Sequence, residues 1–205
     1  MTTPGDLYII AAPSGAGKTS LVAALMEKDD KIKVSISHTT RAMRQGEVDG
    51  ENYFFVDKSV FTEMIAQDAF LEYAEVFGNY YGTSAQTVHD MRQAGFDVIL
   101  EIDWQGARQI KNIFPDAIGV FILPPCLETL ANRLRKRGQD SEVTIAERMR
   151  EAVSEMSHYD EFEYILINKD FDIALEELWA IFCAGRQRLQ RQVIENAELL
   201  KELLG

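Results

Sequence analysis

The chain has 205 residues, 46% of them hydrophobic and 26% charged, which suits one globular domain with a sizeable core and argues against a disordered chain. Its 33 acidic and 21 basic side chains give a formal net charge of -12, so nucleic acid is not expected as a partner and any phosphate site must be local. The first apolar run, residues 7–12, is far shorter than the roughly 20 residues that span a bilayer, and with no export signal before it the sequence predicts a cytoplasmic protein without a membrane partner.

Apolar runs of strand length alternate with longer helical patterns along most of the chain. The strand-like runs are residues 7–12, 98–102, 118–123 and 164–167. The helical patterns start at Lys18, end near Gly95, span residues 104–114 and run from Leu175 to near the C-terminus. This alternation predicts an α/β fold, in which a doubly wound parallel sheet is covered by crossover helices.

Two stretches interrupt the alternation, and we expect them to be lobes inserted into one domain, residues 1–205. The first, about residues 34–82, has short β-like pieces at 53–56 and 71–77 and a short helix after Asp57. Its Arg, Tyr and Gly content indicates a mixed α+β lobe that binds a substrate. The core would then comprise about residues 1–33, 83–126 and 160–205.

The second insertion, about residues 127–159, contains two helical patterns broken at Gly138. Thr144 and Glu147 have the spacing of a capping box, which predicts that the second helix starts there. We expect this segment to be a helical lid.

A phosphate-binding loop is expected between the first strand and the first helix. Gly15 and Gly17 would let backbone N–H groups turn toward phosphate oxygens, Lys18 would neutralise the β- and γ-phosphates, and the Thr19 hydroxyl would bind Mg²⁺. The first position of the motif is Ala12 instead of Gly, which can serve if its φ is negative. The predicted ATP-binding loop is Ala12, Pro13, Ser14, Gly15, Ala16, Gly17, Lys18 and Thr19.

Two carboxylates, Glu101 and Asp103, stand at the end of the second strand-like run, at the edge where ligands gather in open α/β sheets. Carboxylates there can hold Mg²⁺ directly or through water. A strand-end charge in solvent is the alternative for each. The sequence therefore predicts a metal site made of Thr19, Glu101 and Asp103, with Asp103 preferred over Glu101.

The first insertion and the loops around it resemble the guanylate kinase family. The matching segments are residues 13–18, 37–44, 46–47, 53–55, 78–82 and 103–106, and Arg137-Gly138 in the lid. The similarity runs in order from about Leu7 to Asp172, which is most of the chain. It implies a P-loop NTPase-like core, ATP and GMP as substrates, Mg²⁺ as the cofactor, and direct transfer of the γ-phosphoryl group of ATP to GMP.

The resemblance also implies how the phosphate of GMP is held. Arg41, Arg44, Tyr53 and Tyr81 match the positions that grip it, and two guanidinium forks with two phenols suit a dianion. Half-buried strand aromatics are the alternative for the tyrosines.

Glu72, Ser37 and Thr83 match the guanine-binding positions, and Asp103 completes the substrate-binding set. The Glu72 carboxylate only accepts hydrogen bonds, so it suits the two adjacent donors of guanine and would oppose the lone pair of adenine. Thr83 stands where many members carry Ser and keeps the hydroxyl that would donate to O6. A residue near a helix N-cap is the alternative for Thr83.

Basic residues of the second insertion match positions that cover the ATP phosphates when the lid closes. The expected catalytic set is Lys18, Arg41, Arg133, Arg137 and Arg148. A solvated helix end is the alternative for the lid cluster. Asn168 matches a position near the ATP adenine, with a plain turn as its alternative.

Two rival functions stay open at this point. A non-catalytic guanylate-kinase-like module could bind peptides without ATP, although the P-loop lysine and the lid arginines that such a module does not need are present here. A kinase for another nucleoside monophosphate is the second rival, and Glu72 is the residue that discriminates. The cysteines and histidines have no spacing that indicates a metal site or a nucleophile, and the oligomeric state is not indicated.

Overall fold

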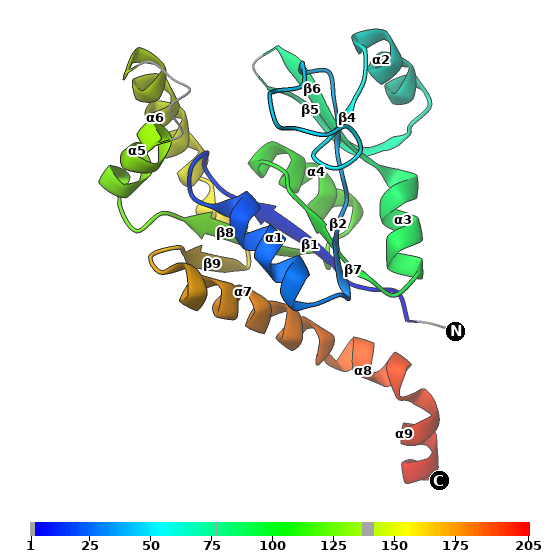
Figure 1. The fold of residues 1–205 in the computed structure, drawn as a ribbon. Coiled ribbons are helices and arrows are strands. Elements are labelled where there is room, and N and C mark those ends of the chain that lie inside the picture. Colours follow the sequence, from blue (N-terminus) through cyan, green and yellow to red (C-terminus); the bar gives the residue numbers. More distant parts are fainter. Residues whose placement is uncertain (1–2, 77, 137–141) are drawn as a thin grey trace.

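The computed structural model describes residues 3–76, 78–136 and 142–205. At its centre five parallel strands form one sheet in the order β2-β7-β1-β8-β9 (Figure 1). The strands are β1 (Leu7–Ala11), β2 (Ile32–Val34), β7 (Asp97–Leu100), β8 (Ile118–Leu123) and β9 (Tyr164–Ile167). The predicted parallel sheet is confirmed; β2 was missed because three residues with a central lysine carry too short an apolar run.

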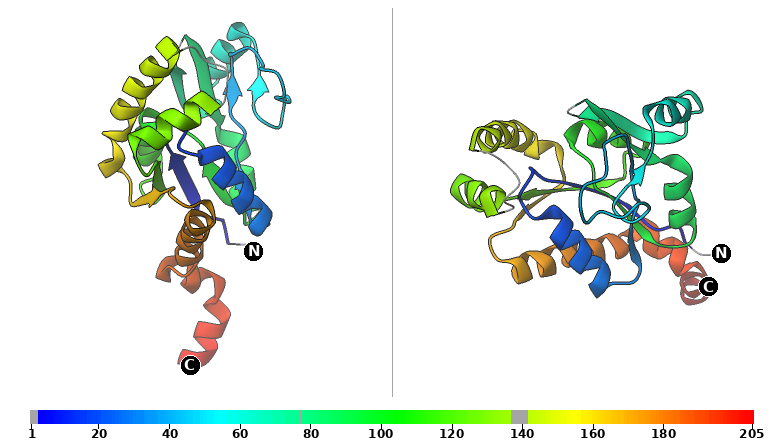
Figure 2. Two further views of the ribbon diagram at one scale, coloured as in Figure 1. Left: turned by 60° about the vertical axis from the view of Figure 1, so that its left-hand side comes forward. Right: turned by 45° about the horizontal axis from the view of Figure 1, so that its top comes forward.

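Helices cover both faces of this sheet, as the views in Figure 2 show. They are α1 (Lys18–Lys28) and α7 (Phe171–Arg186) on one face, and α3 (Ala85–Gln93) and α4 (Trp104–Ile113) on the other. Side chains of β1 alternate between the two, since Tyr8 stacks on Phe182 of α7 at 3.7 Å between ring centroids, whereas Ile9 packs in the cluster of Ile110 from α4. Burial on both faces explains why the strands read as continuous apolar runs.

The central strand β1 lies between β7 and β8; the connection that leaves β1 runs through α1 toward β2 on one side, and the connection that leaves β7 runs through α4 to β8 on the other. A doubly wound sheet opens a crevice at the carboxyl ends of its strands where the order reverses. The segment after β1, which carries the glycine-rich loop, starts at this point.

The first insertion folds into a second sheet of order β4-β3-β6-β5 that stands above the carboxyl ends of the central strands (Figure 1). Its elements are β3 (His38–Thr39), β4 (Phe54–Phe55), α2 (Lys58–Ala66), β5 (Phe70–Val76) and β6 (Asn79–Ser84). The β-like pieces and the short helix expected from the sequence are present, whereas the two-residue β3 and the polar, glycine-containing β6 were not foreseen. The β5–β6 hairpin forms most of the wall toward the core.

The second insertion forms α5 (Leu127–Lys136) and α6 (Glu142–Met156) beside the same end of the sheet. The predicted capping box is wrong, because α6 already includes Glu142 and Thr144 lies inside its first turn. An acidic residue in the first turn stabilises the helix start through the dipole, so Glu142 suits this earlier position. The predicted break at Gly138 lies outside the described residues.

The C-terminal helix was predicted from Leu175 onward as one piece, and this is also wrong. Asp170 accepts hydrogen bonds from the backbone of Asp172 and Ile173, which starts α7 earlier. After α7 the chain continues as α8 (Leu189–Glu195) and α9 (Ala197–Leu204), which extend away from the core (Figure 1).

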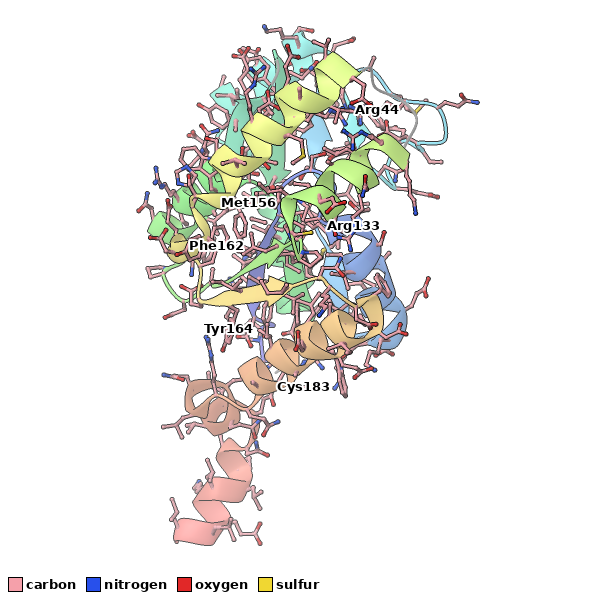
Figure 3. All side chains as sticks on the ribbon, turned by 90° about the vertical axis from the view of Figure 1, so that its left-hand side faces the viewer. Arg44, Arg133, Met156, Phe162, Tyr164 and Cys183 are labelled. Atoms are coloured by element: carbon pink, nitrogen blue, oxygen red, sulfur yellow. The ribbon has the colours of Figure 1, made fainter. Side chains whose placement is uncertain are left out.

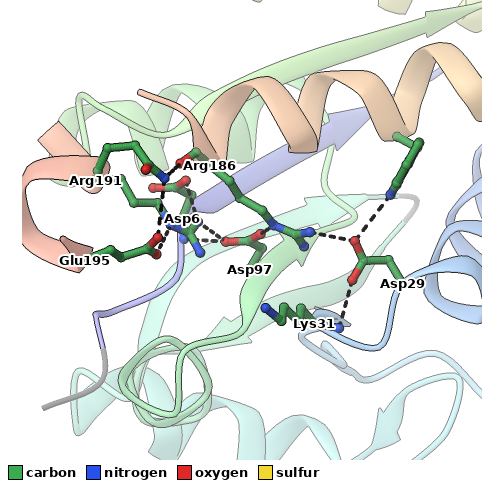
Figure 4. Close-up of polar contacts among 9 residues, drawn as sticks. Asp6, Asp29, Lys31, Asp97, Arg186, Arg191 and Glu195 are labelled. Atoms are coloured by element: carbon green, nitrogen blue, oxygen red, sulfur yellow. Dashed lines mark hydrogen bonds and ion pairs between the residues drawn. The ribbon is translucent and has the colours of Figure 1, made fainter. Parts of the chain in front are cut away.

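An ion-pair network explains the break after α7 (Figure 4). Arg186 and Arg191 donate to opposite oxygens of the buried Asp97, each at 2.6 Å, and reach further to Asp29 and Asp6. A straight helix could not bring side chains five residues apart onto one carboxylate, because they would point about 140° apart. Among the residues that the structure describes, no helix combines the length and apolar character needed to cross a membrane.

Candidate functional site

The glycine-rich loop between β1 and α1 has the backbone that phosphate binding needs. Gly15 and Gly17 have φ values of 94° and 101°, in the left-handed region that favours glycine. A side chain at Gly17 would also place Cβ 2.4 Å from Nδ2 of Asn168. Among the described residues only Asp68 is a non-glycine with positive φ, so Ala12 meets the condition under which alanine can replace glycine there.

Two of the predicted ligand residues support this loop instead of lining the cleft in front of it. Asn168 is 3% exposed, and its Nδ2 donates to the Ala16 carbonyl at 2.8 Å. Arg133, on the core side of α5 in Figure 3, donates to the carbonyls of Ala16 and Asn168 at 3.0 and 3.1 Å. The structure thus places Asn168 and Arg133 in contact with main-chain oxygens of this region, and their predicted contacts with adenine and with phosphates stay predictions.

A cleft of about 390 Å³ opens in front of the loop and joins all three parts of the chain. From the loop it is lined by Ala12, Pro13, Ser14, Gly15, Gly17, Lys18 and Thr19; from the first insertion by Ser37, Arg44, Tyr53, Glu72 and Tyr81; from the strand end by Glu101 and Asp103; and from α6 by Arg148, Glu151 and Glu155. Most of the predicted site residues therefore meet around one space.

The acidic strand end lies beside the phosphate loop. Lys18 Nζ is 3.9 Å from Oε2 of Glu101, and Asp103 caps α4 by accepting a hydrogen bond from the Gly106 backbone at 2.9 Å. No group of three His, Cys, Asp or Glu side chains among the described residues could hold a metal by itself. One hydroxyl and two carboxylates nevertheless fit Mg²⁺, because that ion keeps several waters and takes its other ligands from substrate phosphates.

Glu72 is a buried carboxyl on the lobe side of the cleft. It is 4% exposed, and its Oε1 accepts a hydrogen bond of 2.5 Å from the Thr83 hydroxyl. Burial raises the pKa of Glu72 to about 7, against the smaller lowering effect of the Thr83 hydrogen bond. A Cβ on Gly106 would come within 2.9 Å of Oε2, so the glycine at the start of α4 gives this side chain its room.

Thr83 differs from its expected role. It is fully buried, and its hydroxyl has one hydrogen, which is donated to Glu72. In this structure Thr83 therefore orients Glu72 and does not present a donor to the cleft.

The four residues expected to grip an acceptor phosphate are only partly brought together. Arg44, Tyr53 and Tyr81 line the cleft, with the two tyrosine rings edge to face at 5.9 Å. Arg41 is not among the residues that line it; its guanidinium pairs with Glu47 at 2.7 Å and also hydrogen-bonds to Tyr81, which does line it. Arg137 lies outside the described residues.

Glu151 and Glu155, two carboxylates on the same face of α6 as the predicted Arg148, were not foreseen from the sequence. Arg148, Glu151 and Glu155 follow helical spacing and all reach the cleft, so the spacing was the available signal. Glu155 accepts a hydrogen bond from the backbone of Ser14 and faces Lys18, and burial raises its pKa to about 7. Its neighbours Asp103 and Glu151 act in the same direction.

Comparisons with known proteins agree with this geometry. The family model for guanylate kinase matches residues 5–185. A guanylate kinase of Alkalilimnicola ehrlichii is 57% identical over 202 residues, which are 98% of this chain and 100% of that protein. A guanylate kinase of Methylococcus capsulatus is 55% identical over 203 residues, with 99% and 100% covered. The crystal structure of guanylate kinase from Anaplasma phagocytophilum is 30% identical with a TM-score of 0.76, and the match covers 93% of this chain and 91% of that one.

Proposed function

The chain belongs to the guanylate kinase family and transfers a phosphoryl group from ATP to GMP, and on that premise we propose how its residues divide the work. The observation that carries the proposal is the single cleft, which is lined both by the phosphate loop and by Glu72, Arg44 and the tyrosine pair of the inserted lobe. Two sites that share one space bring a phosphoryl donor and an acceptor into line.

In the acceptor half, Glu72 binds guanine as a carboxylate that accepts from N1–H and the N2 amino group. The buried Thr83 hydroxyl holds Oε1 of Glu72, and Ser37 is the hydroxyl that lines the cleft nearby. Arg44, Tyr53 and Tyr81 bind the GMP phosphate, for which a planar guanidinium and two phenolic O–H groups are suited donors.

In the donor half, the backbone of residues 13–18 cradles the phosphates of ATP, and Lys18 neutralises the charge between the β- and γ-phosphates. Thr19, Glu101 and Asp103 would hold Mg²⁺, for which one hydroxyl and two carboxylates are suitable ligands. The bound ion supplies charge neutralisation at the transferring phosphoryl group. Asn168 and Arg133 keep the loop in shape through the Ala16 carbonyl.

The transfer needs no nucleophile from the protein. An oxygen of the GMP phosphate forms a bond to the γ-phosphorus while the bond to the β–γ bridging oxygen breaks, and ADP leaves with that oxygen. The GMP phosphate is already an oxyanion, so no general base is required. Lys18 and Arg148 stabilise charge on the transferring group from opposite sides of the cleft, and Arg137 is proposed to join them.

The inserted lobes are proposed to close over the two substrates within a single catalytic domain, residues 1–205. The core would be about residues 1–33, 83–126 and 160–205, the GMP-binding lobe about 34–82 and the lid about 127–159. Closure excludes water that would otherwise hydrolyse ATP. We place the enzyme in the cytoplasm, where its nucleotide substrates are made.

The assignment is tested by two substitutions on opposite sides of the cleft. Arg44→Ala should raise the KM for GMP and leave the KM for ATP near its original value, whereas Lys18→Ala should lose most turnover while GMP binding persists. Release of ADP is followed in a coupled assay with ATP, Mg²⁺ and GMP, and GMP binding by calorimetry. Equal effects of both substitutions on the two substrates would contradict the division of the cleft.

A further inference from the structure

Glu47 lies in the Gly46-Glu47 motif of the first insertion, and its carboxylate accepts three hydrogen bonds. Both guanidinium nitrogens of Arg41 donate to it, Nη1 at 3.0 Å and Nη2 at 2.7 Å, and the backbone N–H of Arg44 donates at 2.7 Å. The side chains of Arg41 and Glu47 are 13% and 19% exposed, so the pair is shielded from much of the solvent that weakens surface ion pairs. One carboxylate thus contacts both arginines of the acceptor site.

The pair fixes the orientation of the Arg41 side chain. Its guanidinium carbon lies 5.5 Å from the centre of the Tyr53 ring and 5.6 Å from that of Phe55, and Nη1 also donates to the Ala42 carbonyl at 2.8 Å. Three of its five N–H donors are therefore used by Glu47 and Ala42. The remaining two, on Nε and Nη2, form the other edge of the plane, and Tyr81 is a further hydrogen-bond partner of this side chain.

A tight turn holds Glu47 in place. The Glu47 backbone donates to the Arg44 carbonyl at 3.1 Å, and Gly46 has a φ of 88°, the value that the third residue of a type II turn requires. The Arg44 backbone in turn donates to the Glu47 side chain. Because hydrogen bonds close the turn in both directions, the Glu47 side chain is held beside Arg41. A carboxylate that merely occupied a phosphate site would be free to leave it.

We propose that Glu47 is a positioning residue for the acceptor phosphate, which acts by holding Arg41 and the Arg44 backbone in the geometry that GMP needs. The inference rests on the proposed function, in which Arg44 binds that phosphate, and takes Arg41 as the second arginine of the same site. A long side chain that is ordered in the free protein loses less entropy when the ligand binds. The negative charge of Glu47 repels the phosphate, and on this proposal the gain from holding the Arg41 guanidinium in position outweighs the repulsion.

The test is a double-mutant cycle with Glu47→Gln, Arg41→Ala and both together. Gln keeps the size of Glu47, but its amide NH₂ group is a donor and would face one Arg41 N–H donor to donor. The bidentate pair is therefore broken. Glu47→Gln should raise the KM for GMP on the order of tenfold, as expected for loss of a charge-assisted hydrogen bond, with the KM for ATP unchanged. In the Arg41→Ala background the same substitution should have a much smaller effect, because Glu47 acts mainly through Arg41. Glu51→Gln, an exposed carboxylate four residues further on, is the matched control.

Binding of guanosine separates positioning from general damage to the lobe. Guanosine lacks the phosphate, so Glu47→Gln should weaken GMP binding and leave guanosine binding intact, whereas a collapsed lobe would weaken both. The inference is overturned if GMP binds more tightly to Glu47→Gln, if the two substitutions are additive, or if guanosine binding falls equally. If Arg41→Ala alone leaves the KM for GMP unchanged, the proposed role of Arg41 fails first and that of Glu47 with it.

Discussion

Replacing Glu72 by Gln should stabilise the ligand-free protein and weaken its use of GMP. Glu72 is 4% exposed and accepts one hydrogen bond from Thr83. Burial raises its pKa from 4.5 to about 7, because the charged form loses its water without gaining a cationic partner among the groups that shift it. Gln has nearly the same shape and no charge to desolvate, so the variant separates the effect of the charge from that of the size.

The stability effect has a defined sign and pH window. A carboxyl whose pKa is raised in the folded protein contributes stability that is full below 4.5 and is lost as the pH rises through about 7. The rise of the Glu72 pKa from 4.5 to about 7 corresponds to about 3 kcal/mol, at about 1.36 kcal/mol for each tenfold change in proton affinity. Glu72→Gln should therefore match the wild type in free energy of unfolding near pH 5 and exceed it by up to about 3 kcal/mol near pH 9.

The effect on GMP should have the opposite sign. Gln offers one acceptor and one donor, so it loses one of the two guanine contacts, a loss of roughly 1–3 kcal/mol in kcat/KM at pH 8. The same donor and acceptor match N1 and the N6 amino group of adenine, so AMP should improve. In the wild type, GMP affinity should also fall below pH 7, about tenfold per unit, because guanine needs the ionised carboxylate; the variant should lose this slope.

Urea unfolding at the two pH values and ADP release with GMP or AMP measure both effects. Glu75→Gln, an exposed carboxylate on the same strand, is the control and should change neither quantity. If the stability difference between Glu72→Gln and wild type is the same at both pH values, burial of charge is the wrong explanation. If GMP is still preferred to AMP by the original factor, Glu72 does not select the base.

Other predictions follow from close contacts around the cleft. Gly106→Ala should raise the KM for GMP by about tenfold and spare that for ATP, because Cβ would lie 2.9 Å from Glu72 Oε2; an equal rise for both substrates would contradict this. Gly17→Ala, at a φ of 101° and with Cβ 2.4 Å from Asn168 Nδ2, should lower the melting temperature and remove ATP binding, and a silent substitution would mean the loop can shift. Arg133→Ala should lower the free energy of unfolding by roughly 1.5–3 kcal/mol, since it leaves the Ala16 and Asn168 carbonyls without their charged donor. If urea titration shows no change, Arg133 is a solvated side chain and does not support the loop.

The central sheet and the phosphate loop could be predicted because their signals are local. Strands buried on both faces are apolar at every position, and the two loop glycines that need positive φ, Gly15 and Gly17, are separated by a single residue. The proposed role of Glu72 in selecting the base came from the family resemblance, and its chemistry from the residue type. The burial of Glu72, which raises its pKa, could be recognised only from the fold.

The parts that sequence reasoning missed depend on contacts between distant residues. Ser14 and Glu155 are 141 positions apart, so no spacing rule places the carboxyl at the phosphate loop. Arg133 was assigned to the ATP phosphates by the family resemblance, and only the packing of α5 shows that its donors also meet main-chain carbonyls. The Thr83 hydroxyl was likewise assigned to the ligand, and its hydrogen goes to Glu72.

Glu72 and Glu155, whose pKa values burial raises to about 7, both line this cleft. Burying a carboxyl opposes folding: Glu72 has no cation among the groups that shift its pKa, and the attraction of Lys18 does not offset the burial of Glu155, so each needs a reason in function. Guanine would bring hydrogen-bond donors to Glu72 and favour its ionised form. A triphosphate on the loop would bring negative charge to Glu155, which faces Lys18 and Ser14, and would favour the protonated form. Binding of GMP and of ATP is therefore expected to act on the two carboxyls in opposite directions, with loss of a proton from Glu72 and uptake of a proton by Glu155.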